Sequence, residues 1–134
     1  MAEFEKDTRN RFGKSERLSS QKTIESLFSK GKSFNQHPYV VKFMKLPDES
    51  ASVHQILVSV SKRNFKRAVD RNRLKRQIRE AYRLNKHLIA DLPDKYAIAY
   101  IYSFKKMLPY KDIESKLIEC LYRLQTELSV KNED

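Results

Sequence analysis

Residues 62–83 constrain the fold of this chain more than any other segment, because they are strongly basic and also have the hydrophobic period of a helix. They contain ten lysines and arginines but only two acidic residues, Asp70 and Glu80. Their net charge of +8 makes up most of the +11 of the whole 134-residue chain. A concentrated block of one sign creates a surface field that attracts a polyanion. The alternative is a solvated helix face, although such faces usually mix the two signs at i,i+4 spacing.

The apolar residues of this region repeat with the period of an α-helix, which we predict over residues 66–91 and which Pro93 ends. At about 100° per residue they fall on one side of the helix. The basic residues and the amide of Asn72 fall on the adjoining flank. One helix is therefore expected to pack against a core and to bind a partner at the same time. The predicted packing side consists of Leu74, Ile78, Ala81, Asn85, Leu88 and Ile89.

Upstream of the basic block, the spacing predicts one helix and two strands. The helix begins after Ser19 or Ser20 as the N-cap, and Gly31 is its stop signal. Residues 39–44 alternate in a β-rich run, and a turn separates them from a second alternating run at residues 56–60. Two antiparallel strands are the simplest arrangement of these runs.

Downstream, residues 96–102 (YAIAYIY) predict a third strand, and the apolar spacing after Pro109 predicts a last amphipathic helix. Helices and strands in this order favour an α+β fold, a single-sheet α/β sandwich, over a doubly wound parallel fold. A chain of this length forms one core. We expect a polar flexible N-terminal tail over residues 1–16, a single polyanion-binding domain over residues 17–128 and a short C-terminal tail over residues 129–134.

The composition excludes several classes of protein. No run approaches the roughly 20 apolar residues that a membrane span needs, so we expect a cytoplasmic protein. Cys120 is the single cysteine, which excludes an internal disulfide, and its apolar helical setting predicts a buried, inert thiol. The two glycines, Gly13 and Gly31, form no loop that could wrap a nucleotide phosphate.

The sequence offers no candidate catalytic or metal-binding residues. The three histidines, His37, His54 and His87, lie in separate segments without ligand spacing, and we expect each at the surface or in a loop. What remains is the basic helix, whose arginines can donate in pairs to phosphate oxygens. Asn72 is different, because a neutral amide between two arginines suits a base edge, a sugar hydroxyl or a backbone group.

The basic helix resembles the protein component of bacterial ribonuclease P, whose hallmark is an Arg-Asn-Arg motif followed by further basic residues. Here the motif is Arg71-Asn72-Arg73, and Leu74-Lys75-Arg76 and Arg79 continue it. The similarity extends from about Arg17 to Leu128. It includes the runs Ser59-Val60-Ser61-Lys62-Arg63, Arg67-Ala68 and Glu80-Ala81-Tyr82-Arg83.

The resemblance implies an α-β-β-β-α-β-α order like the second domain of ribosomal protein S5, with a left-handed β-α-β crossover that departs from the usual right-handed rule. It adds a strand between Gly31 and Gln36 that is too short to predict from the pattern. It also implies that the RNA subunit is the catalyst and that the protein itself is noncatalytic. The RNA cleaves precursor tRNA with Mg²⁺ to leave the mature 5′ end, while the protein binds that RNA and the 5′ leader.

By position, the resemblance implies two sets of contact residues. The residues expected to face the RNA are Lys62, Arg63, Arg67, Arg71, Asn72, Arg73, Lys75, Arg76 and Arg79. The leader is expected in a cleft between the first helix and the sheet, lined by Ile24, Phe28 and Lys42. Phe28 can equally be a core residue. Lys42 stands where some members have an aromatic residue. Strand alternation would turn Tyr39 and Phe43 to the opposite face, and the sequence leaves open whether these two residues face the cleft or the core. The Ala-Arg pair common after the last strand of the family is replaced by Ile101-Tyr102.

Two other classes of function stay open at this point. A ribosomal or nucleoid-associated basic structural protein would use the same basic helix, and a nucleoid protein would bind duplex DNA at least as well as structured RNA. A protein nuclease with a hidden metal site would cut RNA unaided. The partners expected under the first hypothesis are ribonuclease P RNA and precursor tRNA, with no cofactor bound by the protein itself and no disulfide partner.

Overall fold

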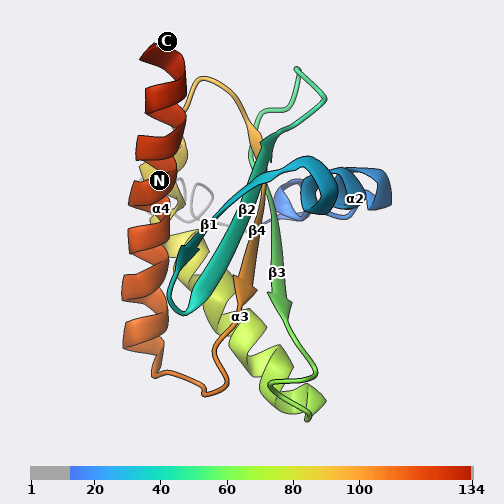
Figure 1. The fold of residues 1–134 in the computed structure, drawn as a ribbon, viewed down its shortest axis with the longest axis vertical. Coiled ribbons are helices and arrows are strands. Elements are labelled where there is room, and N and C mark those ends of the chain that lie inside the picture. Colours follow the sequence, from blue (N-terminus) through green and yellow to red (C-terminus); the bar gives the residue numbers. More distant parts are fainter. Residues whose placement is uncertain (1–12, 134) are drawn as a thin grey trace, which may run out of the picture.

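A four-stranded sheet with helices on both faces forms the centre of the structure, a computed structural model that describes residues 13–133, with side chains described through residue 128 (Figure 1). The predicted order of helices and strands is confirmed, including the short strand after Gly31. The elements are η1 (Lys14–Glu16), α2 (Gln21–Lys30), β1 (Lys32–Gln36), β2 (Tyr39–Lys45), β3 (Gln55–Val60), α3 (Ala68–Asn85), η2 (Lys86–Ile89), β4 (Tyr96–Tyr102) and α4 (Tyr110–Glu133).

The strands lie in the order β1-β2-β4-β3. β2 is antiparallel to both β1 and β4, and β3 is parallel to β4 with Ile56 opposite Ile98. The prediction that residues 39–44 and 56–60 pair with each other is therefore wrong, because β4 lies between them. A parallel pair needs a long crossover, and α3 is that crossover between β3 and β4. Strand pattern alone shows where strands are and not which of them are neighbours.

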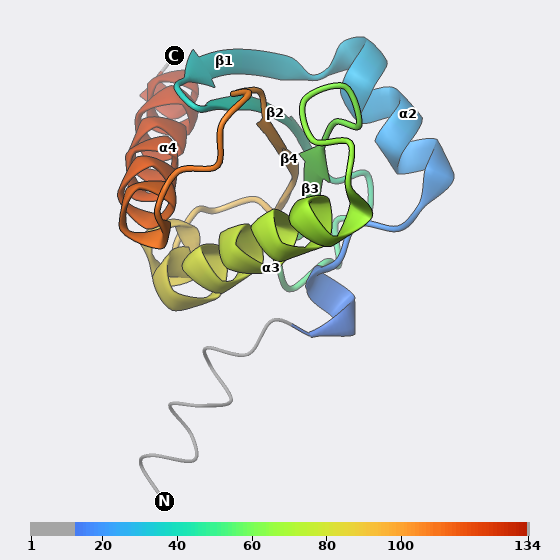
Figure 2. The ribbon, with the colours of Figure 1, turned by 90° about the horizontal axis from the view of Figure 1, so that it is seen from below.

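The two faces of the sheet carry different helices, as Figure 2 shows: α3 and α4 cover one face and α2 crosses the other. The larger core lies under α3 and α4, where β4 contributes Ile98, Tyr100 and Tyr102. The alternate residues Ala97 and Ala99 belong to the smaller core with Leu27 of α2. Small side chains on this face let α2 approach the sheet backbone closely. The alternation of large and small residues in YAIAYIY thus determines which face holds the main core.

The predicted bounds of the first helix are confirmed in α2. The Ser20 hydroxyl accepts a hydrogen bond from the Thr23 amide at 3.3 Å, which caps the helix N-terminus. At the other end, the Gly31 amide donates to the Leu27 carbonyl at 3.0 Å. Gly31 has an ordinary backbone conformation with φ −69°, so its role is close approach. A Cβ at this position would collide with the carbonyl oxygen of Leu27.

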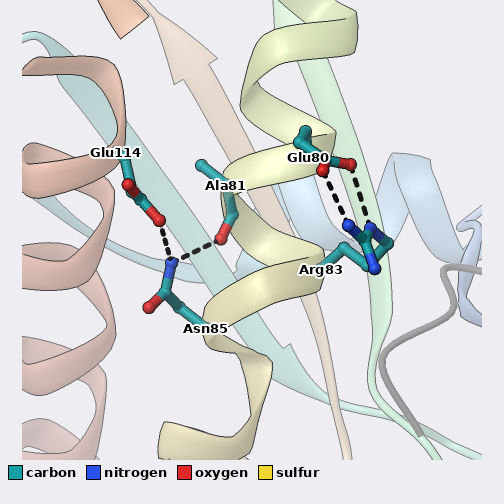
Figure 3. Close-up of polar contacts among 5 residues, drawn as sticks. All are labelled: Glu80, Ala81, Arg83, Asn85 and Glu114. Atoms are coloured by element: carbon teal, nitrogen blue, oxygen red, sulfur yellow. Dashed lines mark hydrogen bonds and ion pairs between the residues drawn. The ribbon is translucent and has the colours of Figure 1, made fainter. Parts of the chain in front are cut away.

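The basic helix ends earlier than predicted, because α3 stops at Asn85 and η2 follows it. The Asn85 side-chain amide donates to the Ala81 carbonyl at 2.8 Å and to the Glu114 carboxylate of α4 at 2.9 Å (Figure 3). A side chain that bonds back to the preceding turn competes with continued helix. The hydrophobic period runs on into η2, where Ile89 is buried, so the period alone did not reveal the break.

His54 is buried, contrary to the expectation of a surface or loop histidine, with an exposed fraction of 5%. Its Nε2 lies 2.8 Å from the Ile89 carbonyl oxygen, and its Nδ1 accepts from the Tyr96 amide at 3.0 Å. The ring therefore joins the start of β3 to η2 and β4. Cys120 is buried as predicted, and burial raises the pKa of its thiol to about 12.

The expected tail boundaries differ from the observed elements. Residues 1–12 of the predicted N-terminal tail lie outside the described residues. The last residues of this predicted tail form η1 (Lys14–Glu16). Glu16 is buried, and its carboxylate is compensated there by an ion pair with Lys86. At the other end, α4 continues through residues 129–133, since nothing in that stretch breaks a helix.

Candidate nucleic-acid interface

The connection between β3 and α3 begins the basic surface. Lys62 and Arg63 are exposed in it, while Phe65 packs on the larger core. The guanidinium of Arg71 reaches back from the first turn of α3 and donates to the carbonyls of Phe65 and Lys66, both at 2.8 Å. Arg71 is consequently half-buried and shapes the loop that presents Lys62 and Arg63.

The flank of α3 carries the rest of the predicted RNA-facing residues. Leu74 and Ile78 are fully buried, which confirms that the helix packs along one side. The residues of the flank range from exposed to half-buried. The exposed ones are Arg67, Asn72, Arg73 and Arg76, and the half-buried ones are Arg71, Lys75 and Arg79.

Both acidic residues of the block pair with arginines of the same region. Asp70 lies 3.9 Å from Arg67, and Glu80 accepts two hydrogen bonds from Arg83, at 2.9 Å from Nε and 2.7 Å from a terminal nitrogen (Figure 3). The arginine lowers the pKa of the Glu80 carboxyl through these hydrogen bonds. The block contains ten cationic side chains and only these two carboxylates, so it keeps a surplus of positive charge even when both ion pairs are formed.

A shallow basin of about 610 Å³ gathers part of the flank into one concave surface. Its lining includes Arg17, which comes from the segment before α2 and was not among the predicted contact residues. Arg17 and Arg79 both line this basin, and burial, followed by the charge of Arg17, lowers the pKa of the Arg79 guanidinium. No local pattern could have identified Arg17, because only the tertiary fold brings it to α3. The basin is lined by Arg17, Asn72, Lys75, Arg76, Arg79, Glu80 and Arg83.

The face of the sheet beside α2 carries the predicted leader-cleft residues. Phe28 is 41% exposed, so it is not a core residue, and the Lys42 ammonium lies 5.9 Å from the centroid of its ring. Ile24 is half-buried and packs on the smaller core. Tyr39 and Phe43 are 1% and 3% exposed and belong to the core on the opposite face, as alternation predicted.

A row of half-buried residues continues this face beyond Lys42. By strand register, Val40 lies opposite Ile101, and Ile101 lies opposite Ser59. All three side chains are partly accessible. Ser59 stands three residues before Lys62, so the row leads toward the basic connection. We call Ile24, Phe28, Lys42, Val40, Ile101 and Ser59 the α2-side strip. Ile101, at the position where the family pattern is absent, thus belongs to this surface.

Among the side chains that the structure describes, those of residues 13–128, no group of three or more His, Cys, Asp or Glu is arranged to hold a metal ion. Among the helices of that same part of the chain, none is long and apolar enough to cross a membrane.

Comparison with known protein families shows one consistent match. The family model described as Ribonuclease P matches residues 12–125. A ribonuclease P protein component of Porphyromonas gingivalis is 38% identical over 127 residues, which cover 90% of this chain and 93% of that protein. One of Clostridium botulinum is 35% identical over 109 residues, which cover 81% of this chain and 93% of that protein.

Solved structures show the same fold. The RNase P protein of Thermotoga maritima superposes with a TM-score of 0.66 at 27% sequence identity, over 81% of this chain and 96% of that one. The RNase P protein of Staphylococcus aureus gives a TM-score of 0.66 over 82% of this chain and 94% of that one. At 23% identity, this second comparison concerns the fold alone. Both agree with the mixed α+β arrangement of one sheet and three helices described above.

Proposed function

Because the chain belongs to the family of ribonuclease P protein components, we propose that it binds the catalytic RNA of that ribonucleoprotein together with the 5′ leader of precursor tRNA. In doing so it assists the endonucleolytic removal of the leader, which leaves the mature tRNA 5′ end. The observation that carries this proposal is the flank of α3, where a surplus of cations is held on a helix whose other side is fully buried.

The α3 flank suits structured RNA. Arginine presents a planar fork that matches two phosphate oxygens, and its face can stack on a base. Arg73 and Arg76 are exposed and stand on a helix that packing holds rigid. Asn72, on the rim of the basin, adds a neutral donor and acceptor suited to a base edge or a ribose hydroxyl. We assign the RNA contacts to Lys62, Arg63, Arg67, Arg71, Asn72, Arg73, Lys75, Arg76 and Arg79.

The α2-side strip suits a single-stranded leader. Phe28 offers a partly exposed aromatic ring for stacking, and Ile24 offers an apolar contact beside it. Lys42 offers a cation for a phosphate. Stacking on aromatic side chains tolerates any base, which a leader of varying sequence requires. The strip leads toward Lys62, so one strand of RNA can pass from the leader site to the basic connection.

We assign catalysis to the RNA subunit with Mg²⁺ and only binding and orientation to the protein. Guanidinium and ammonium groups are hydrogen-bond donors without an acceptor site, which suits the interface to binding and orientation. We place the process in the cytoplasm, with ribonuclease P RNA and precursor tRNA as the partners.

Reconstitution tests this function. The purified chain is mixed with a bacterial ribonuclease P RNA and a precursor tRNA at low Mg²⁺ concentration, and cleavage is followed with each component omitted in turn. We expect cleavage only when the RNA subunit is present and faster cleavage when the protein is added. Cleavage by the protein alone would indicate a nuclease. No effect of the protein on the RNA, together with equal or tighter binding to duplex DNA, would indicate a nucleoid protein.

A further inference from the structure

The segment before α2 is fixed to the start of η2, directly after the basic helix, by a buried ion pair. The Lys86 ammonium lies 2.9 and 3.0 Å from the two carboxylate oxygens of Glu16. The exposed fractions of the two side chains are 16% and 9%. The same carboxylate accepts a hydrogen bond from the Gly13 amide at 3.1 Å, which closes η1 on itself. A buried carboxylate that lost either partner would be left poorly compensated, so this arrangement holds η1 in one place.

The residue after this anchor is Arg17, and its backbone is held on both sides. Its amide donates to the Lys14 carbonyl at 3.1 Å, and the residue forms a parallel bridge with Ile56 of β3. The following amide, of Leu18, donates to the Ile56 carbonyl at 2.9 Å. With the main chain fixed in this way, the Arg17 side chain projects into the basin of α3.

The basin brings together cations from two separate segments of the chain. Arg17 comes from one segment, and Lys75, Arg76, Arg79 and Arg83 come from another, while Glu80 is the single carboxylate in the lining. Cations held near one another repel, and a bound phosphate offsets this repulsion because it attracts each of them. Burial lowers the pKa of the Arg79 guanidinium, and the charge of Arg17 lowers it further, in the direction that this repulsion requires.

We infer that Arg17 completes a phosphate-binding basin for the backbone of the catalytic RNA, and that Glu16 is a positioning residue that acts through Arg17. The inference rests on the proposed function. Asn72 of the motif on α3 lines the basin, whereas Phe28 and Lys42 belong to the α2-side strip. We therefore assign the phosphates to the RNA subunit and not to the leader.

Substitution of Arg17 tests the contact. Affinity for ribonuclease P RNA is measured over a range of salt for the full chain, for Arg17→Gln and for Lys14→Gln. Lys14 is the matched control, because it is an exposed cation of η1, three residues before Arg17, and is not among the residues that line the basin. We expect Arg17→Gln to weaken binding about five- to tenfold and to lower the salt slope by about one unit, and Lys14→Gln to change affinity less than about twofold. Equal effects of the two substitutions would overturn the inference.

Two further measurements separate the sources of the effect. If Arg17→Gln changed only the affinity of the holoenzyme for precursor tRNA and not that of the protein for the RNA subunit, the assignment to the RNA subunit would be wrong. Arg73→Ala is the reference for the proposed function, since Arg73 is exposed outside the basin lining. A loss with Arg73→Ala and none with Arg17→Gln would refute the inference alone, whereas no loss with either would count against the proposed function.

A double-mutant cycle tests the positioning role of Glu16. Removing a carboxylate makes the protein more positive, so a purely electrostatic effect of Glu16→Gln would tighten RNA binding. We expect weaker binding instead, by about threefold in the native background, and no further loss when Arg17 is already Gln. Lys86→Met breaks the same anchor from the other side and should show the same dependence on Arg17. Losses that are equal in both backgrounds would show that the ion pair acts on the fold and not through Arg17.

Discussion

The ammonium nitrogen of Lys42 lies 5.9 Å from the centroid of the Phe28 ring, so a cation from β2 stands over an exposed aromatic side chain from α2. Such a pair contributes about 0.5–1 kcal/mol at an exposed site. That is small enough for an incoming nucleotide to replace it, with the base against the ring and the phosphate on the ammonium. The pair thus offers both parts of a nucleotide a partner in one place.

Phe28→Ala should weaken binding of precursor tRNA by the holoenzyme more than binding of mature tRNA, because only the precursor carries a leader. Loss of one stacked base corresponds to about 1–3 kcal/mol. The fold should be little affected, since the ring is half exposed. Paired affinity measurements with the two tRNAs check this, and the neighbouring buried Leu27→Ala is the contrasting variant, expected to lower the free energy of unfolding by about 2–5 kcal/mol. Equal losses for both tRNAs would argue against a leader site here.

Lys42→Gln should lower the salt dependence of precursor binding by about one unit of slope, because one phosphate contact is removed. Lys45→Gln is the control on the same strand, as Lys45 lies 3.5 Å from Asp94 at the far end of β2. Precursor affinity is measured at several salt concentrations for both variants. An unchanged slope in Lys42→Gln would mean that this cation does not meet the leader backbone.

Arg71 and Arg73 should differ although they flank the same asparagine. Arg73→Ala is expected to weaken assembly with the RNA by about 1–3 kcal/mol and to leave the fold unchanged. Arg71→Ala is expected to weaken assembly and also to lower the free energy of unfolding by about 1 kcal/mol, since its guanidinium bonds the carbonyls of Phe65 and Lys66. Urea unfolding and RNA affinity, measured on both variants, check the distinction. Identical unfolding curves for the two would refute the structural role of Arg71.

Stability should fall with acid because of His54. The neutral ring satisfies the Ile89 carbonyl and the Tyr96 amide, and burial lowers the pKa of His54 below its ordinary value near 6.5. The unfolded chain takes up a proton below about pH 6.5 that the folded chain resists. This contribution to stability is therefore fully present above that pH and is lost progressively as the pH falls from there through the lower pKa of the folded state.

Urea unfolding at several pH values between about 7.5 and 5.5 measures this effect. His54→Gln should be less stable at the upper pH and should show a flatter pH dependence than the native chain. His87→Gln, which changes an exposed histidine, should keep the native pH dependence. The explanation would be wrong if His54→Gln and the native chain lost stability in parallel.

Much of the molecule follows from local pattern. Ser20 and Gly31 bound α2 because capping and close approach act within a few residues. The alternation in β2 predicted that Tyr39 and Phe43 point away from Lys42, and the structure, by burying both, decides the choice between cleft and core that the sequence left open. The period of α3 predicted that Leu74 and Ile78 pack while Arg73 and Arg76 stay exposed.

Other features depend on partners far away in the chain. The end of α3 depends on Asn85 meeting Glu114, and the burial of His54 depends on Ile89 and Tyr96. The pairing of β3 with β4 depends on a crossover that no strand pattern contains. Local sequence carries no signal for such contacts, because each residue type involved is also common at surfaces and in loops.

By itself, the sequence determined the basic helix, its buried side, the alternation of the strands and the resemblance that these residues carry. All of these depend on the charge and the spacing of neighbouring residues. Only the tertiary structure decided that Phe28 is exposed beside Lys42, that Arg71 supports the loop before its own helix and that Arg17 reaches the basin of α3. These features arise from segments that meet in space, where burial and the pairing of charges depend on the whole fold.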